Sequence, residues 1–346
     1  MSKLELNEIF NFNETADDCV KCGKCIPVCT IHNINPDEVT SPRGFLDLLG
    51  AYKQGHLELD KNAKDIFESC FLCVACVEVC PKSIPTDMVI EQVRADIATE
   101  FGIAWYKRAF FLLLRHRWLN DIAFKLGWSF QTCGFKIKAE TNSMNSRGSL
   151  PMLKTDRLLP SLTKTSFLNS YPENINNGGK RKVAIFIGCL ANYNYTGIGD
   201  SLLEVLQALE IDAFLAKSQK CCSAPAYFTG DFNTVDSLAK FNIEYFESFS
   251  RDVEAILVPE ATCSAMLKVD YEHYFHDQPD WRARAKVVMG KVHMATEWLQ
   301  NHTQLETVLA SKKQDTKIVT YHDPCHAKKM QGIHEEPRNL IRQNYK

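Results

Sequence analysis

Eight cysteines between residues 19 and 80 repeat one spacing twice, and this repeat constrains the chain more than any other feature. Each copy reads C-x2-C-x2-C-x3-C, the bacterial pattern that holds 4Fe-4S clusters. Three cysteines of one copy bind one cluster, and the fourth cysteine reaches the cluster of the other copy. The spacing therefore predicts two adjacent 4Fe-4S clusters. The first is expected on Cys19, Cys22, Cys25 and Cys80, and the second on Cys70, Cys73, Cys76 and Cys29.

Other uses of these cysteines explain less of the pattern. A zinc ribbon needs two C-x2-C pairs and would leave half of the cysteines unused. Disulfides require an oxidising compartment, and cysteines three residues apart on a tight turn are poor bridge partners. One departure is visible, because Pro81 follows the second copy whereas Thr30 follows the first, with Pro27 inside it. This departure removes no ligand.

Length and composition restrict the class of protein. The chain has 346 residues, enough for two or three domains, and 45% of them are apolar. A net charge of -2 gives no field that would attract nucleic acid. Fourteen cysteines without a secretory signal indicate a reducing cytoplasm, and no apolar run is long enough for a transmembrane helix. We therefore expect a cytoplasmic protein, with any membrane association peripheral and on the inner face of the cytoplasmic membrane.

Residues 1–100 are predicted to form a helical ferredoxin domain that carries both clusters. Helical spacing of apolar residues within the insert between the two cysteine copies indicates one helix around Phe45–Tyr52. Thr86 is a candidate cap for a second helix that runs to Phe101. Helices around the clusters favour this class over a small β-rich ferredoxin.

Residues 101–182 are predicted to hold an amphipathic helix and a linker. The segment 101–130 combines aromatic and leucine side chains with five basic residues and one acid, Asp121. This composition is typical of a helix on anionic lipid, and docking on the chain's own core or on a partner subunit is the alternative. From about Thr141 to Lys182 the chain is rich in Asn, Ser and Gly and loses periodicity. Cys133 fits no pattern and is expected to be a small apolar filler.

Residues 183–316 alternate strand-like and helix-like segments, which predicts an α/β domain. Its cysteines follow the expected strands, and ligands gather at that edge of open α/β sheets. The predicted site consists of Cys189, Cys221, Cys222 and Cys263. Four thiolates suit a third 4Fe-4S cluster or a zinc ion, and buried structural cysteines are the alternative.

The order Gly-Cys, then Cys-Cys, then a strand-terminal cysteine resembles the cysteine-rich CCG domain. This domain occurs in a subunit of heterodisulfide reductase and in the iron-sulfur subunits of anaerobic glycerol-3-phosphate dehydrogenase and glycolate oxidase. A two-cluster ferredoxin fused to such a domain is similar to the last two. Two departures stand out, because Ser223 replaces the glycine and Met266 replaces the last cysteine of the family's CxxC. A four-ligand site is therefore expected, not a five-thiolate cluster.

Residues 317–346 look like the start of a second CCG half that stops early. The stretch KIVTYHDPCH echoes VAIFIGC, so a strand is expected to lead into Cys325, with a helix following over EEPRNLIRQ. The early stop suggests a truncated or interrupted version of a longer protein. Cys325 is a further candidate metal ligand, and His322, Asp323 and His326 could assist it. Local hydrogen bonding is the alternative for both histidines, and the remaining histidines are expected at the surface.

No dinucleotide fingerprint or nucleophile elbow is present, so catalytic residues are not identified. The expected function is that of an electron-transfer subunit of an oxidoreductase. The resemblance implies that a FAD-dependent dehydrogenase subunit oxidises a 2-hydroxy acid, such as glycolate or D-lactate, and that the electrons go towards the quinone pool, with membrane contact through residues 101–130. The alternatives are a heterodisulfide-reductase-like thiol/disulfide oxidoreductase, a glycerol-3-phosphate dehydrogenase subunit, and a scaffold with structural zinc.

Overall fold

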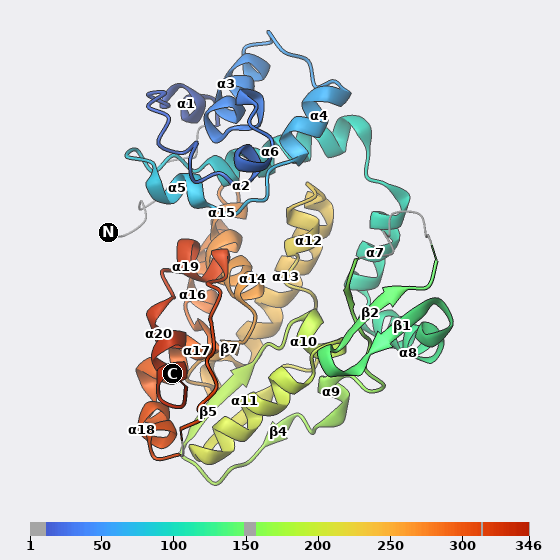
Figure 1. The fold of residues 1–346 in the computed structure, drawn as a ribbon, viewed down its shortest axis with the longest axis vertical. Coiled ribbons are helices and arrows are strands. Elements are labelled where there is room, and N and C mark those ends of the chain that lie inside the picture. The colour runs from blue at the N-terminus through green and yellow to red at the C-terminus, as the bar shows by residue number, and fades with distance from the viewer. Residues whose placement is uncertain (1–11, 149–156, 313, 346) are drawn as a thin grey trace.

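The computed structural model describes residues 12–148, 157–312 and 314–345. A helical N-terminal domain sits on one end of an α/β domain, and a helical arm with a small sheet projects beside them (Figure 1). The predicted class, a helical ferredoxin domain followed by an α/β CCG domain, is confirmed.

The N-terminal domain is built from six helices among the described residues. They are α1 (Phe12–Asp17), α2 (Thr30–Ile34), α3 (Pro42–Lys53), α4 (Lys61–Glu68), α5 (Ala75–Val79) and α6 (Thr86–Phe101). Helix α3 begins where the Ser41 hydroxyl accepts a hydrogen bond from the Gly44 amide at 2.9 Å, with Pro42 in the first turn. The core of the domain lies between α3, α4 and α6 and includes Phe45, Phe67 and Val93. Both helices expected from the sequence are present.

The arm corrects two expectations for residues 101–182. The segment 101–130 forms two helices, α7 (Trp105–Arg115) and α8 (Arg117–Gly134), because His116 takes an extended conformation and breaks the helical ladder. The expected linker contains a three-stranded antiparallel sheet of β1 (Phe135–Lys138), β2 (Ser143–Ser146) and β3 (Leu159–Pro160). Strands of two to four residues are too short to show a period in the sequence. Part of the expected linker, 149–156, lies outside the described residues.

A five-stranded sheet forms the centre of the α/β domain, in the order β4-β6-β5-β7-β8. Only β4 (Asn174–Ile175) is antiparallel to its neighbour. The other strands, β5 (Arg181–Ile185), β6 (Ile211–Leu215), β7 (Ile256–Val258) and β8 (Val292–Met294), pair in parallel. Their carboxyl ends therefore lie at one edge of the sheet, where the predicted cysteine site is expected.

Helices cover both faces of this sheet (Figure 1). Residues of α13 (Phe232–Phe249) and α16 (Pro279–Met289) pack on Ala184, Phe186 and Val292 from one side. Residues of α9 (Phe167–Ser170), α11 (Gly197–Ala208), α17 (Ala295–His302) and α18 (Leu305–Ala310) pack on Val183, Ile185 and Leu257 from the other. The alternation along β5 gives the two buried faces of a parallel sheet.

The C-terminal segment differs from the expected second half-domain. Residues 317–324 form no strand, and Ile318 is 91% exposed, because no strand among the described residues lies beside this stretch. Cys325 instead begins the helix α19 (Cys325–Gln331). The expected following helix is present as α20 (Glu335–Arg342).

Candidate metal centres

The first four-cysteine set lines one cavity of about 450 Å³ in the N-terminal domain. Its cysteines are Cys19, Cys22, Cys25 and Cys80, with Cys76 at its side. A basic rim surrounds it, formed by Lys21, Lys24, Arg43 and Lys82. Burial raises the pKa of Cys25, backbone hydrogen bonds at Cys25 and Arg43 oppose this change, and the neighbouring Cys19 and Cys22 add to it.

The second set lines a neighbouring cavity of about 430 Å³. Its cysteines are Cys29, Cys70, Cys73 and Cys76. Leu72 and Val74 between them take left-handed backbone conformations, with φ of 52° and 62°, so the loop turns sharply around the cavity. Burial raises the pKa of Cys70 to about 11 and also raises the pKa of Cys76, to which the nearby Cys70 and Asp87 charges add.

These cavities fit a pair of 4Fe-4S clusters in donor chemistry. Each is lined by the four thiols that the crossed spacing assigns to one cluster, and Cys76 lies between the two cavities. A neutral thiol in such a buried place resists ionisation, whereas bound iron stabilises the thiolate. Ligation by these eight cysteines remains a prediction that the geometry supports.

Arg94 on α6 joins the second cavity to the α/β domain. Its guanidinium donates to the backbone carbonyls of Phe67 and Glu68 at 3.1 Å each and of Cys70 at 2.6 Å. It also donates at 2.9 Å to the carbonyl of Phe228, which lies in the α/β domain. The side chain is buried, so one cation supports the Cys70 loop and the domain interface together.

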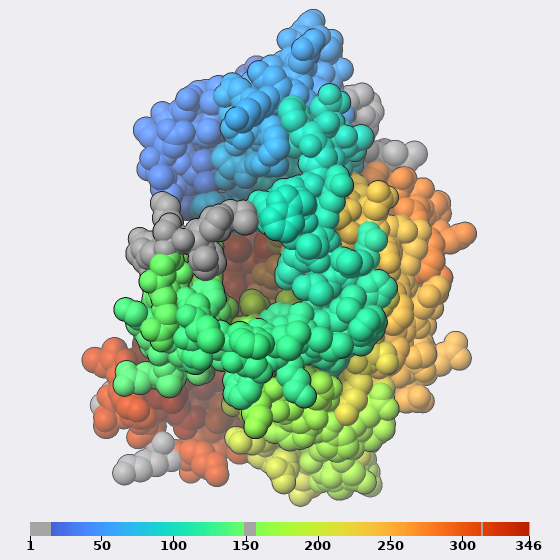
Figure 2. Space-filling view, turned by 90° about the vertical axis from the view of Figure 1, so that its right-hand side faces the viewer, coloured from blue at the N-terminus to red at the C-terminus, as the bar shows by residue number. Residues whose placement is uncertain are grey.

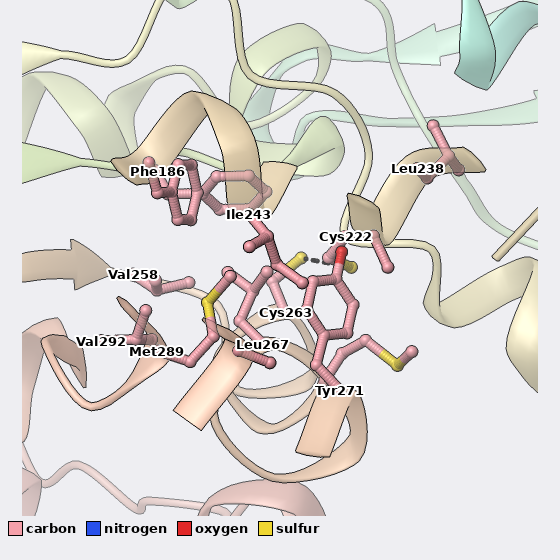
Figure 3. Close-up of a cluster of buried hydrophobic side chains, with 14 of the residues drawn as sticks. Phe186, Cys222, Leu238, Ile243, Val258, Cys263, Leu267, Tyr271, Met289 and Val292 are labelled. Carbon is pink, nitrogen blue, oxygen red and sulfur yellow. Dashed lines mark hydrogen bonds between the residues drawn. The ribbon is translucent and has the colours of Figure 1, made fainter. Parts of the chain in front are cut away.

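The four cysteines of the α/β domain come together at the predicted edge of the sheet. Cys189 begins α10 (Cys189–Tyr193), Cys221 and Cys222 follow β6, and Cys263 lies on α14 (Ala261–Ala265). The Cys222 and Cys263 sulfurs are 3.3 Å apart (Figure 3). Further thiol hydrogen bonds join Cys189 to Cys221 and Cys221 to Cys222. The four sulfurs therefore form a continuous chain.

Burial and hydrogen bonds between the thiols set the pKa values in this chain of cysteines. A hydrogen bond with Cys221 and burial raise the pKa of Cys189. In Cys263, the hydrogen bond with Cys222 lowers the pKa. Burial and the Glu260 charge outweigh this effect and raise the pKa of that thiol to about 12. A bound cation would reverse these shifts, so the donor set fits a metal centre.

Glu260 is a functional candidate that sequence reasoning missed. Its carboxylate accepts a hydrogen bond from the Ala191 amide at 3.2 Å and lies 3.5 Å from the Cys263 sulfur. Burial raises the pKa of Glu260. The approach is close, because a Cβ at Gly188 would lie 2.4 Å from this carboxylate. The sequence carries a signal for this residue, because Glu260 is an acid that stands between the buried strand β7 and the candidate ligand Cys263.

Tyr271 and Asn242 form a polar layer behind the vicinal pair. The Asn242 side chain donates to the Cys221 carbonyl at 3.0 Å and lies 3.3 Å from the Tyr271 hydroxyl. The hydroxyl lies on the side of Cys222 (Figure 3). Ser223, which stands where the family has glycine, is fully buried with φ of 73°, the left-handed region that favours glycine. The backbone thus keeps the family's turn without its glycine.

A cleft of about 350 Å³ leads from the arm to this site. Cys189 and Cys221 lie at its lining, together with Leu114 and Asn120 of α7 and α8. The buried Asn120 side-chain oxygen has no hydrogen-bond partner among the described residues. Tyr193, also at the cleft, donates its hydroxyl to Asp121 at 2.7 Å. The cleft is therefore polar at the cysteines and offers one free acceptor to a small molecule.

His326 connects the second cavity with the cysteine site of the α/β domain. Its Nε2 lies 3.3 Å from the Leu72 carbonyl, and its Nδ1 lies 3.1 Å from the Thr262 hydroxyl. Burial lowers the pKa of His326, so the ring is neutral. A carbonyl only accepts, so Nε2 donates to Leu72 and Nδ1 accepts from Thr262. One buried imidazole thus bridges the loop of Cys70 and Cys73 and the helix of Cys263.

The other C-terminal candidates do not join the cysteine site. Cys325 lines neither the N-terminal cavities nor the cleft and is not part of the sulfur chain. Asp323 is engaged by Arg338 at 2.7 Å and by Lys328 at 3.4 Å. The structure gives His322 no role among the described contacts. Metal binding by Cys325 remains a prediction without further geometric support.

The outer face of the arm is apolar. Trp118, Ile122, Leu126 and Phe130 lie four residues apart along α8 and are 63%, 50%, 54% and 65% exposed. Figure 2 views the molecule from the side of the arm and shows a hollow beside it. Two basic residues hold the arm in place, because Arg115 donates to Thr234 and Arg117 to the Lys217 carbonyl. Cys133 is exposed, which corrects the expectation of a buried filler, because the arm's outer face has no covering layer.

Comparisons with known proteins give the class. Residues 15–84 match the 4Fe-4S dicluster domain family, and residues 183–268 match the cysteine-rich CCG domain family. The chain therefore combines a 4Fe-4S dicluster domain with a CCG domain and is an iron-sulfur protein. No helix among the described residues is long and apolar enough to cross a membrane.

Individual relatives carry more specific names than the two domain families. The chain is 28% identical over 358 residues to a probable glycolate oxidase iron-sulfur subunit of Bacillus subtilis, covering 98% of this chain and 78% of that protein. It is 34% identical over 160 residues to lactate utilization protein A of Bacillus cytotoxicus, 46% of this chain and 64% of that one. It is 27% identical over 325 residues to an uncharacterized iron-sulfur protein of Methanococcus maripaludis, 93% of this chain and 54% of that one. The chain is thus an iron-sulfur protein related to glycolate oxidase and lactate utilization proteins, and it spans little more than half of some relatives.

Proposed function

We propose that this chain is the electron-transfer subunit of a 2-hydroxy-acid dehydrogenase. The observation that carries the proposal is the contact between three cysteine sites: two cavities that meet at Cys76, and a third site bridged to the second by His326. When bound, 4Fe-4S clusters supply one-electron transfer. The chain's residues hold these sites close together and bury Cys222 and Cys263 of the third site.

The likeness to glycolate oxidase and lactate utilization proteins supports a FAD-dependent dehydrogenase subunit as the partner. Its docking surface is expected around the first cavity, where Cys22 is exposed and Val20 is 61% exposed. The basic rim of this cavity is largely compensated by the chain's own acids, because Lys21, Arg43 and Lys82 pair with Asp47, Glu38 and Asp18, so exposure and not charge supports this surface. The second cavity faces the α/β domain instead.

The cleft at Cys189 and Cys221 supports a quinone as acceptor. The cleft opens onto Cys189 and Cys221, so a quinone ring seated in it would lie against two of the candidate ligands. The Tyr193–Asp121 pair lies beside it as a proton-holding group. This proposal requires two electrons from the metal centres and two protons from solvent to convert quinone to quinol.

A contact of the arm with anionic lipid would bring the cleft to a quinone-containing bilayer. The apolar row on α8 gives the buried face that an interfacial helix needs, and exposed Lys125 lies within it. Replacing Trp118 and Leu126 with Asp should reduce co-flotation with vesicles of phosphatidylglycerol at least about tenfold. Val287→Asp, at an exposed apolar position on α16, is the matched control. Equal flotation of both variants would refute the contact.

The alternative of thiol/disulfide chemistry at the CCG site lacks support from the site itself. Met266 stands at the position of the family's last cysteine and is fully buried, so the fifth thiol is absent. Structural zinc is the other alternative, and four thiolates suit it as well as they suit a cluster. Metal analysis separates the two.

Metal analysis after anaerobic purification tests the proposal. About 12 irons and 12 sulfides per chain would mean three 4Fe-4S clusters, and about 8 irons, with a zinc ion on sulfur ligands, would remove the CCG site from the relay. The second measurement mixes the loaded chain with the partner flavoprotein and glycolate or D-lactate and follows cluster bleaching. No reduction by either 2-hydroxy acid, with full iron content, would refute this function and leave glycerol 3-phosphate as the next substrate to test.

A further inference from the structure

Three metal-binding side chains converge at the edge strand of the sheet, and none of them is a cysteine. His293 lies on β8, and Glu297 and His302 lie on α17, which follows it directly. One ligand atom from each lies within 4.8 Å of the other two. His293 Nδ1 and Glu297 Oε2 are 3.1 Å apart. From this geometry we propose that His293, Glu297 and His302 form a binding site for a divalent transition metal ion, with zinc as the expected occupant.

The fold directs these groups toward one point. Val292 and Met294 are buried in the core, so the alternation of the strand places His293 on the opposite side. Helix α17 buries Ala295, Trp298 and Leu299, which leaves Glu297 on its flank near His293. The His302 ring stacks on Trp298 at 5.8 Å and meets the His293 ring edge-on at 5.8 Å.

The spacing suits a tetrahedral ion. Ligands at about 2.0–2.1 Å from zinc lie about 3.3 Å apart, close to the observed separation of His293 and Glu297. The exposed His302 ring can close the remaining distance by rotation, and water can fill the fourth position. Two imidazoles and one carboxylate are a donor set that zinc accepts and that iron-sulfur clusters do not use.

Two cations lie near these groups. Lys268 acts on the Glu297 carboxylate through its charge. Arg181 is close by, since it donates to the His302 carbonyl at 2.8 Å. Its charge is neutralised by Glu254, with two hydrogen bonds at 2.8 and 2.6 Å. The Arg181 charge is therefore compensated, and Lys268 is the cation whose repulsion a bound divalent ion has to overcome.

An ordinary ion pair between His293 and Glu297 is the competing explanation, and His302 distinguishes the two. The test uses the cluster-loaded chain, equilibrated with zinc chloride, desalted and analysed for zinc and iron. His302→Gln and His293→Gln should each lower zinc affinity by at least about 10–100-fold, because even outer-shell changes have effects of that size. His334→Gln is the matched control, because His334 is an exposed histidine 3.9 Å from Glu335.

The expected result is about one zinc per chain in the wild type and in the control, and none in the two site variants, with iron unchanged in all four. Equal zinc retention in His302→Gln and the wild type would overturn the site. X-ray absorption separates zinc on cysteine, with Zn–S at about 2.3 Å, from zinc on nitrogen and oxygen at about 2.0–2.2 Å. A sulfur shell around the retained zinc would likewise overturn it. Because zinc and iron are read separately, failure of this site and failure of the electron-transfer function are distinguishable.

Discussion

Replacing Arg94 with methionine removes every donor of the guanidinium while keeping an apolar stem of similar length. Five hydrogen bonds to four backbone carbonyls are lost, at distances from 2.6 to 3.4 Å. Each lost bond contributes about 1 kcal/mol net to stability. Methionine also removes the cost of burying a charged guanidinium, which offsets part of this loss, so we expect the free energy of unfolding to fall by about 3–4 kcal/mol. The Cys70 loop loses its support at the same time, so iron content should fall by up to one cluster.

Anaerobic urea denaturation of the loaded chain, followed by circular dichroism and by iron absorbance, measures both effects. Arg284→Met is the control, because Arg284 pairs with Glu247 at the surface and such pairs contribute about 0–1 kcal/mol. The reasoning is refuted if Arg94→Met unfolds within about 1 kcal/mol of the wild type and keeps its iron.

Three further predictions concern the same interface. His326→Ala leaves the buried Leu72 carbonyl unsatisfied at about 1–3 kcal/mol and removes the contact with Thr262, so hydrogen exchange should quicken in residues 70–74 and 260–264, and unchanged exchange would contradict the bridge. Gly230→Ala places a Cβ 2.2 Å from a carbonyl of α6 at φ of 83°, so it should destabilise more than Gly55→Ala, which has the same kind of φ (74°) but open space, and equal midpoints in urea would contradict this. Burial and neighbouring acids raise the pKa of Glu91 well above 4.5, so the folded chain keeps a proton that the unfolded chain releases, and stability falls as pH rises above about 4.5. Glu91→Gln should flatten that fall in urea titrations from pH 5 to 8, and an unaltered slope would count against it.

Local patterns in the sequence predicted the fold class because they follow from short-range rules. The helix containing Phe45 and Leu49 and the buried strand before Cys189 appear where periodicity placed them. The expected strand before Cys325 does not appear. A strand needs a neighbouring strand to pair with, and the periodicity of its own residues does not reveal whether there is one. The short sheet of the arm was missed because its strands, although paired, are too short to show an alternating pattern in the sequence.

The supports of the candidate centres were harder to predict than the cysteines. Cysteine spacing is a local signal, whereas Arg94 meets Phe228 across 134 positions of sequence and His326 meets Leu72 across 254. Only tertiary packing brings such residues together. Glu260 is the exception, because it stands three residues before Cys263 and carries a readable local signal.

Each four-cysteine cavity includes one cysteine from the other copy of the motif, since Cys80 lies in the first cavity and Cys29 in the second. With these cysteines as ligands, neither motif holds a complete set until the stretch from Thr30 to Ser69 has folded back. Iron insertion and folding of this domain are then a single concerted event. Oxidative loss of one cluster would release a segment that also carries a ligand of the other cluster. Loss of the first cluster should therefore promote loss of the second.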